Sequence, residues 1–243
     1  MSILTFLPLK SLYISNKQTT NNKQQTTNNK QQNHHKQMNQ LAFHFDASAC
    51  SGCKTCQVAC KDKHNSPLGV RWRRVYEVCG GEWTKQGAAW VPRLQAYHIS
   101  MACNHCQDPI CLHACPNKAI IKNDQGVVLI NYDRCMGCRY CEWTCPYGAL
   151  QFDPQQKIMT KCNFCADYLE EGKAPSCVSA CPMRVLAFGE LEELQKQHGV
   201  NNEDFPLPKE HYTQPALIIT SHKDASSADK KALKIANREE VRP

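Results

Sequence analysis

The sequence predicts an α+β fold in which short helices and hairpins surround four groups of cysteines. Three observations lead to this prediction. The 243-residue chain contains 17 cysteines, and sixteen of them recur in four groups of four. Short runs alternate apolar and polar residues, which is typical of strands. The longest apolar runs, 3–9 and 216–219, fall far short of the ~18 residues of a membrane-spanning helix, so we expect no direct membrane span.

The first 40 residues differ from the rest in composition. Residues 16–40 are almost all Asn, Gln, Thr, Lys and His, and such a segment cannot bury enough apolar surface to fold. We therefore predict a disordered tail at 1–37, and we hypothesise that translation starts at Met38. Residues 1–40 also carry five lysines and no acid, so the net charge of +7 becomes +2 without them (7 − 5 = 2). This balance argues against a nucleic acid partner.

Strand signals precede and follow the first cysteines. Leu41–Asp46 alternates apolar and polar residues and leads directly into the first group. Two further strand-like runs, Arg73–Val78 and Val91–Ile99, lie around Gly80-Gly81. Together they predict a strand and then a β-rich insertion.

The second half of the chain predicts one more hairpin and a helix. Ala119–Lys122 and Val127–Ile130 are separated by the turn-forming residues 123–126. Glu190–His198 has a helical pattern that Gly199 ends. Beyond Phe205 the sequence predicts an extended tail.

The four cysteine groups, called quartets here, share a two-residue first gap and a three-residue last gap. They are Cys50, Cys53, Cys56 and Cys60; Cys103, Cys106, Cys111 and Cys115; Cys135, Cys138, Cys141 and Cys145; and Cys162, Cys165, Cys177 and Cys181. The two-residue spacing places three thiolates around one face of an iron–sulfur cubane. Quartets two to four end in Cys-Pro, and proline suits the first turn of a helix, so we expect a short helix to start there.

Other uses of cysteine fit this pattern less well. Disulfide scaffolds are usually short, secreted and even in cysteine count, whereas this chain is long, has an odd count and shows no secretory pattern in residues 1–15. Zinc sites do not explain a third closely spaced cysteine or the Cys-Pro endings. We find no phosphate loop, dinucleotide fingerprint or nucleophile elbow, so we expect no catalytic residues in this chain.

In two-cluster ferredoxins the fourth cysteine of each run binds the other cluster. The same rule predicts four [4Fe–4S] clusters, bound to iron through sixteen cysteines. The ligands are Cys50, Cys53, Cys56 and Cys181 for cluster 1; Cys60, Cys162, Cys165 and Cys177 for cluster 2; Cys103, Cys106, Cys111 and Cys145 for cluster 3; and Cys115, Cys135, Cys138 and Cys141 for cluster 4.

This pairing predicts two ferredoxin-like modules of the tandem two-cluster type. The outer module comprises 38–62 and 156–190, and the inner module comprises 97–155. A hairpin insertion at 63–96 lies between them, and a C-terminal helix and wrapping tail occupy 191–243.

Several residues near the ligands have a simpler interpretation than a functional one. Lys54, Lys118, Arg139, Lys161 and Arg184 could raise the potential of a neighbouring cluster, but solvated surface charge is the simpler interpretation of each. Cys79 has no ligand spacing and is predicted to be a buried, unreactive thiol. His105 and His113 lie in a complete quartet and are not expected to be ligands. The tryptophans are interpreted as packing residues, with an interface role as the alternative; they are Trp72, Trp83, Trp90 and Trp143.

Several of these runs resemble one family. Ser51–Asp62, Arg73–Glu77 and Gly80–Trp83 resemble the iron–sulfur B subunits of anaerobic dimethyl-sulfoxide reductases, which are among the four-cluster electron-transfer subunits of molybdopterin oxidoreductases. The same holds for Cys103–Cys106, Gly137–Cys141, Cys145–Ala149 and Met159–Cys162. The resemblance covers about residues 41–220.

The resemblance implies a non-catalytic electron-transfer subunit in a three-subunit complex. A molybdopterin-containing catalytic subunit would reduce dimethyl sulfoxide, and an integral membrane anchor would oxidise quinol. In a related nitrate reductase branch the second cysteine of quartet three is replaced, but here it is Cys138, so a complete four-iron cluster is expected. Such bacterial subunits cross the membrane folded, beside a twin-arginine-tagged partner, which implies a peripheral position on the periplasmic face of the cell membrane.

Three alternatives stay open. Tetrathionate, polysulfide, nitrite and formate enzymes use similar subunits, so the partner is open. A stand-alone iron–sulfur enzyme would be active without a partner. A zinc-structured binding module would be colourless, whereas an iron–sulfur protein is brown.

Overall fold

The computed structural model describes residues 39–201, 204–208, 213–225 and 233–241, and the structural statements below refer to these ranges. Residues 37–243 form one compact unit. The predictions of a disordered tail at 1–37 and of a start at Met38 lie outside the described residues.

Strand β1 (Leu41–Asp46) is the centre of the first sheet. It pairs antiparallel with β8 (Leu186–Glu190) and parallel with β9 (Leu217–Thr220). Helix α6 (Leu191–His198) packs its apolar residues against Ala42 of β1. The strand at 41–46 is therefore confirmed, and so is the helix, which ends before a glycine in the left-handed conformation.

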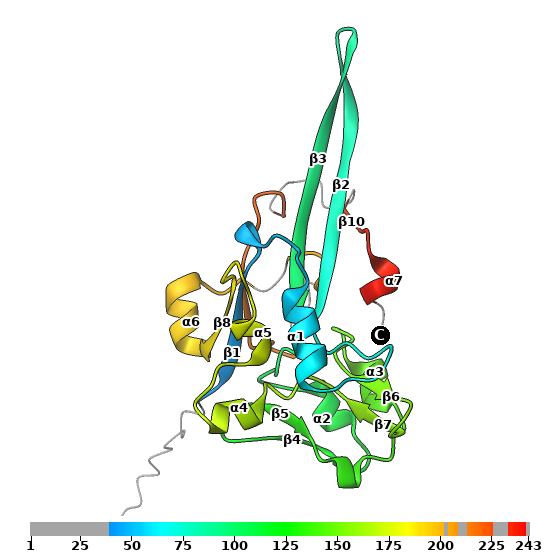
Figure 1. Cartoon of the computed structure of the whole chain (residues 1–243), viewed down its shortest axis with the longest axis vertical. Coiled ribbons are helices and arrows are strands. Elements are labelled where there is room, and N and C mark those ends of the chain that lie inside the picture. Colours follow the sequence, from blue (N-terminus) through cyan, green and yellow to red (C-terminus); the bar gives the residue numbers. More distant parts are fainter. Residues whose placement is uncertain (1–38, 202–203, 209–212, 226–232, 242–243) are drawn as a thin grey trace, which may run out of the picture. The chain divides into compact units, whose positions relative to one another are not determined.

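A long hairpin forms the second sheet. Strands β2 (Arg74–Gln86) and β3 (Ala89–Met101) pair antiparallel along their whole length, and Figure 1 shows the end of this hairpin standing clear of the other labelled elements. The turn lies at 87–88, and Gly80 and Gly81, around which the sequence predicted two strand-like runs, lie within β2. A Cβ on Gly81 would lie 2.0 Å from the carbonyl oxygen of Arg93. The strands approach closely at this point, so glycine serves the approach and not a turn.

The C-terminal segment is more structured than the predicted extended tail. Strand β9 completes the first sheet, and β10 (Lys234–Ile235) pairs with β2. Helix α7 (Arg238–Val241) follows. Just before α7, the amide of Asn237 bonds both ways with β2: it accepts from the Glu77 N–H at 2.9 Å and donates to the Val75 carbonyl at 2.8 Å.

The remaining helices and hairpins are short and surround the cysteines. They are η1 (Ala47–Ala49), α1 (Thr55–Lys63), α2 (Ile110–Ala114), η2 (Tyr132–Arg134), α3 (Tyr140–Thr144), α4 (Ala166–Glu170) and α5 (Ser176–Ser179), with hairpins β4 (Ile120–Lys122)–β5 (Val128–Ile130) and β6 (Gln151–Asp153)–β7 (Ile158–Thr160). The hairpin predicted at 119–130 is confirmed. Helices and small sheets are mixed, which confirms the α+β class.

The Cys-Pro pairs end helices instead of starting them. Cys115 and Cys145 are the C-caps of α2 and α3, so the prediction of a helix starting at each proline was wrong. Proline is common just after a helix end, because it cannot continue the helix. Cys60 is not followed by proline, and the nine-residue helix α1 accordingly continues past it to Lys63.

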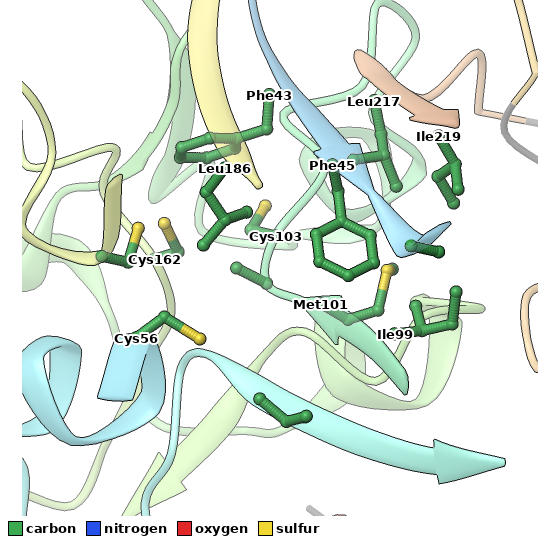
Figure 2. Packing of buried hydrophobic residues seen from close by; sticks show 14 of the residues in the cluster. Phe43, Phe45, Cys56, Ile99, Met101, Cys103, Cys162, Leu186, Leu217 and Ile219 are labelled. Carbon is green, nitrogen blue, oxygen red and sulfur yellow. The ribbon is translucent and has the colours of Figure 1, made fainter. Parts of the chain in front are cut away.

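The predicted modules are continuous with each other. The boundary proposed at 155/156 lies between β6 and β7, which pair at Asp153 and Ile158. The hydrophobic core also joins the sheets to the cysteines: Figure 2 shows Phe45 of β1 beside Leu217 of β9, and Cys103 and Cys162 belong to the same buried cluster.

Candidate iron–sulfur centres

Three cavities are each lined by four cysteines, and we number these cysteine sets as the predicted clusters. They are set 1 (Cys50, Cys53, Cys56 and Cys181), set 3 (Cys103, Cys106, Cys111 and Cys145) and set 4 (Cys115, Cys135, Cys138 and Cys141). Each cavity contains about 310–340 Å³ of space free of protein atoms, including its opening to solvent. In each set, three cysteines come from one quartet and the fourth from another.

The other four ligand candidates form set 2, which is Cys60, Cys162, Cys165 and Cys177. All four are buried, and α1, which carries Cys60, packs on α5, which carries Cys177. Burial, followed by the charge of Cys177, raises the pKa of Cys60 to about 12. The structure thus brings together the same groups of four that the exchange of fourth cysteines predicts.

The cysteines suit metal binding better than cross-linking. All seventeen are free thiols. Burial is the main cause that raises the pKa of Cys50 to about 11 and those of Cys106 and Cys141 to about 12. A buried thiolate needs a cation beside it, and metal binding supplies one as it releases the proton. In the part of the chain that the structure describes, no three His, Cys, Asp or Glu side chains converge on a single-ion site. Sets 1, 3 and 4 instead each surround a volume, as a polynuclear cluster requires.

The loops around the sets repeat one backbone conformation. The residue before the second cysteine of every quartet has a positive φ: Gly52 (69°), His105 (42°), Gly137 (69°) and Phe164 (62°). Left-handed residues in such loops turn successive N–H groups toward one side, and this concave arrangement binds anions, including iron–sulfur clusters. A Cβ on Gly52 would lie 2.3 Å from the ring of His98, and one on Gly137 would lie 2.2 Å from the Lys157 carbonyl oxygen.

Backbone N–H groups also donate to the sulfur atoms. These bonds run from Ala119 to Cys115 (3.3 Å), from Phe164 to Cys162 (3.4 Å) and from Met159 to Cys135 (3.5 Å). Donors of this kind stabilise thiolate charge and tune the potential of a cluster that is bound there.

Two of the five lysines and arginines singled out in the sequence are neutralised by carboxylates. Lys54 lies 2.8 Å from Glu77 and 2.5 Å from Glu240, and Arg139 lies 2.7 Å from Glu142. Surface charges that are paired in this way have little effect on a neighbouring site.

Lys161 differs from these two residues because it is buried. Its ammonium group donates to the carbonyl oxygens of Val128 and Cys162. Lys118 and Arg184 each lie three residues after a ligand candidate, with positive φ, and so repeat the loop conformation of the quartets.

Arg73 is the charged residue that the sequence analysis missed. It is only 2% exposed, and its Nη1 donates to the hydroxyl of Ser100 at 3.2 Å. That hydroxyl lies 3.3 Å from the sulfur of Cys56. The available signal was a cationic residue at the start of a strand between two quartets, but spacing alone does not indicate where such a strand packs.

Other predictions about single residues had mixed outcomes. Cys79 lies on β2 outside the four sets and is half-buried, so the prediction of a buried thiol was wrong. Trp72 is buried, but Trp83, Trp90 and Trp143 are 62%, 62% and 75% exposed, so packing was the wrong expectation for three tryptophans.

The two histidines of quartet two bond elsewhere. Nδ1 of the buried His105 accepts from the Val128 N–H at 3.1 Å, and His113 Nε2 lies 2.8 Å from Asp108. That neither histidine is a ligand stays a prediction. None of the described helices has the length and apolar composition to cross a membrane.

Known proteins are similar to this chain in sequence. A family model described as a 4Fe-4S dicluster domain matches residues 94–191. The chain is 43% identical over 202 residues to the B chain of the anaerobic dimethyl sulfoxide reductase of Escherichia coli, a match that covers 83% of this chain and 98% of that protein. It is 34% identical over 204 residues to the B subunit of the sulfite dehydrogenase of Allochromatium vinosum, a match that covers 74% of this chain and 82% of that protein. It is also 35% identical over 167 residues to the thiosulfate reductase electron transfer subunit PhsB of Salmonella typhi, which covers 68% of this chain and 84% of that protein.

Proposed function

The chain belongs to the family of anaerobic dimethyl sulfoxide reductase B chains, and from this premise we propose that it relays electrons through four [4Fe–4S] clusters, from a quinol-oxidising membrane anchor to a molybdopterin catalytic subunit that reduces dimethyl sulfoxide. Each bound cluster would supply one-electron transfer. The chain itself supplies the cysteines that hold the clusters. Its fold keeps the clusters in order and shields them from water.

The observation that carries the proposal is the succession of four complete four-cysteine sets. Sets 1 and 2 share α1, which contains Cys56 of set 1 and Cys60 of set 2. Sets 2 and 3 meet where Cys162 and Cys103 lie in one buried cluster, and the charge of Cys103 contributes, after burial and Cys60, to raising the pKa of Cys162.

Sets 3 and 4 share two helices. Cys111 lies in α2 and belongs to set 3, and Cys115 caps α2 and belongs to set 4. In α3 the order is reversed, because Cys141 belongs to set 4 and its capping residue Cys145 to set 3. These shared elements support an order from set 1 through sets 2 and 3 to set 4.

Both ends of this series reach the surface. Cys53 of set 1 and Cys138 of set 4 are the exposed cysteines. Trp143, 75% exposed, lies on α3, which begins two residues after Cys138, and Tyr140 is beside it. Exposed aromatic residues are common where proteins bind one another. We therefore place one partner subunit at each end.

We further propose that the anchor holds this chain on the periplasmic face of the cell membrane as a peripheral subunit. Trypsin added to intact spheroplasts should then degrade it, as it degrades a periplasmic control protein. Protection until the spheroplasts are lysed would contradict the periplasmic position without affecting the electron relay.

Anaerobic purification of the whole complex tests the relay. We expect brown protein whose iron and acid-labile sulfide correspond to four clusters in this chain, with a paramagnetic spectrum that appears on reduction by dithionite. Dimethyl sulfoxide should then reoxidise the reduced complex. Colourless protein that contains zinc would overturn the proposal.

A second candidate keeps the relay and changes the partner. The relatives that act with sulfite and thiosulfate enzymes favour it, and tetrathionate, polysulfide, nitrite and formate enzymes belong to the same alternative. Identification of the copurified catalytic subunit by mass spectrometry, followed by reoxidation assays with each acceptor, separates these candidates. Turnover by the isolated chain would instead indicate a stand-alone iron–sulfur enzyme.

A further inference from the structure

We propose that Arg73 is a fixed, buried cation shared by the clusters of sets 1 and 2, and that it raises the reduction potentials of these two clusters. This inference rests on the proposed function, because it requires clusters in both sets. It adds a positioned charge between the sets, which determines where along the series an electron is held most favourably.

The contacts of Arg73 place it between the two sets. Its Nη1 donates to the Ser100 hydroxyl at 3.2 Å, and that hydroxyl lies 3.3 Å from Cys56 of set 1. On the other side, its guanidinium lies 4.8 Å from the ring of Phe43, which stacks on Phe164 at 4.1 Å. The Phe164 N–H in turn donates to the sulfur of Cys162 in set 2.

The mutual electrostatic effects agree with this position. Burial by itself disfavours a charged guanidinium, but the charges of Cys177 and Cys56, one from each set, are the largest that raise the pKa of Arg73. Conversely, the positive charge of Arg73 favours the thiolate form of Cys60, which belongs to set 2. Arg73 therefore acts on thiols of both sets.

Among the described residues, no carboxylate neutralises the charge of Arg73. In the described ranges no ion pair joins Arg73 to an acid, whereas Lys54, which lines the cavity of set 1, contacts both Glu77 and Glu240. A buried charge without a counter-ion costs several kcal/mol. A cluster held by four thiolates carries net negative charge, so bound clusters would provide the counter-ion that the protein lacks.

The guanidinium of Arg73 also has hydrogen-bond donors that are not used. Its Nε and Nη2 are buried and have no hydrogen-bond partner among the described residues, and buried donors of this kind are rare. The next residue, Arg74, is equally buried but uses its Nη atoms on the carbonyl oxygens of Tyr147, Gly148 and Val241. Arg74 therefore links distant chain segments, whereas Nε and Nη2 of Arg73 have no acceptor among the described residues.

The sign of the effect follows from charge. Reduction adds one negative charge to a cluster, and a nearby cation in a low-dielectric interior stabilises the more negative state. Arg73 stays protonated at all physiological pH values. The potentials of two clusters are therefore raised, while those of sets 3 and 4 do not depend on this residue.

The test is a redox titration of the complete complex, prepared anaerobically and followed by paramagnetic resonance. We expect Arg73→Gln to shift the reduction equilibrium of two of the four clusters at least tenfold toward the oxidised form, which is about 59 mV for a one-electron couple. Arg73→Lys, which keeps the charge, should stay within tenfold of the wild type. Arg93→Gln, the same change at an exposed site on β3, should leave all four unchanged.

Each other outcome is decisive. Unchanged potentials in Arg73→Gln, with full iron content, would overturn the inference and leave the proposed function intact. Equal shifts of all four clusters, or equal loss of two clusters in the Gln and Lys variants, would show a role in packing only and overturn it too. Loss of two clusters in Arg73→Gln, with wild-type potentials in Arg73→Lys, would support the shared counter-ion. If the wild-type complex contained no iron and sulfide in this chain, the proposed function itself would be refuted.

Discussion

Lys54 and Glu240 form an ion pair of 2.5 Å that joins the loop of the first quartet to the C-terminal helix α7. The two residues are 186 positions apart in the chain, and Gln57 of α1 donates to the same carboxylate at 3.0 Å. The C-terminal segment is thereby tied to the loop that carries Cys53.

Removal of this pair should loosen α7. In Glu240→Gln we expect a loss of about 1 kcal/mol or less in the free energy of unfolding, because both side chains are about 30% exposed. Amide hydrogen exchange in 234–241 should become faster. Glu171→Gln removes an exposed pair with Lys173 and serves as the control, which should leave exchange in 234–241 unchanged.

The same pair predicts a pH window. The hydrogen bond with Glu240 raises the pKa of Lys54, so this contribution is present below about pH 10.4 and is lost as pH rises through the folded-state pKa. Burial alone would raise the pKa of Glu240, but the bond from Lys54 lowers it. Its contribution is present above about pH 4.3 and is lost as pH falls further. The protection factors of the amides in 234–241, which are corrected for the intrinsic pH dependence of exchange, should stay constant between pH 6 and 9, and a change there would contradict this window.

His44 predicts a loss of stability in mild acid. Its ring stacks on His198 at 3.6 Å and bonds to Thr220 at 2.9 Å, and burial, followed by the charge of His198, lowers its pKa. The unfolded chain therefore binds a proton more readily, and stability falls as pH drops below about 6.5. Denaturant unfolding at pH 7.5 and 5.5 should show a smaller difference in His44→Gln than in the wild type.

Gly137 allows the loop of set 4 to pass close to the β6–β7 turn. Gly137→Ala meets both a positive φ of 69° and the Lys157 carbonyl oxygen at 2.2 Å. Gly172→Ala is the matched control, because its φ is 71° but nothing lies within 4 Å. We expect the control to lose about 1–2 kcal/mol of stability, and Gly137→Ala to lose more, together with iron. Equal losses in the two variants would contradict the close approach.

Cys138 and Cys79 provide a test of ligand identity. Cys138→Ser should change the paramagnetic spectrum of one cluster and lower the iron content, because it removes a ligand of set 4. Cys79→Ser should change neither, since Cys79 lies in none of the four sets. Chemical iron analysis and spectra of both variants check this prediction, and an iron loss in Cys79→Ser would overturn the assignment.

Local patterns were sufficient for part of this protein. Alternation identified the strand at 41–46, and a turn sequence identified the hairpin at 119–130, because the signals for both lie within a few residues. Cysteine spacing identified the four quartets, and the exchange of fourth cysteines known from two-cluster ferredoxins predicted which four thiols come together. That these groups hold clusters stays a prediction.

Long-range packing decided the rest. In the sequence the glycines at 80 and 81 separate two strand-like runs, but strand pairing placed both glycines within one long strand and made Gly81 a place of close approach. Residues 217–220 became a buried strand only because β1 offered an open edge. The sequence by itself determined the cysteine groups and the family; only the tertiary structure placed Arg73 between two sets, because the burial and charge of a side chain depend on neighbours that are distant in sequence.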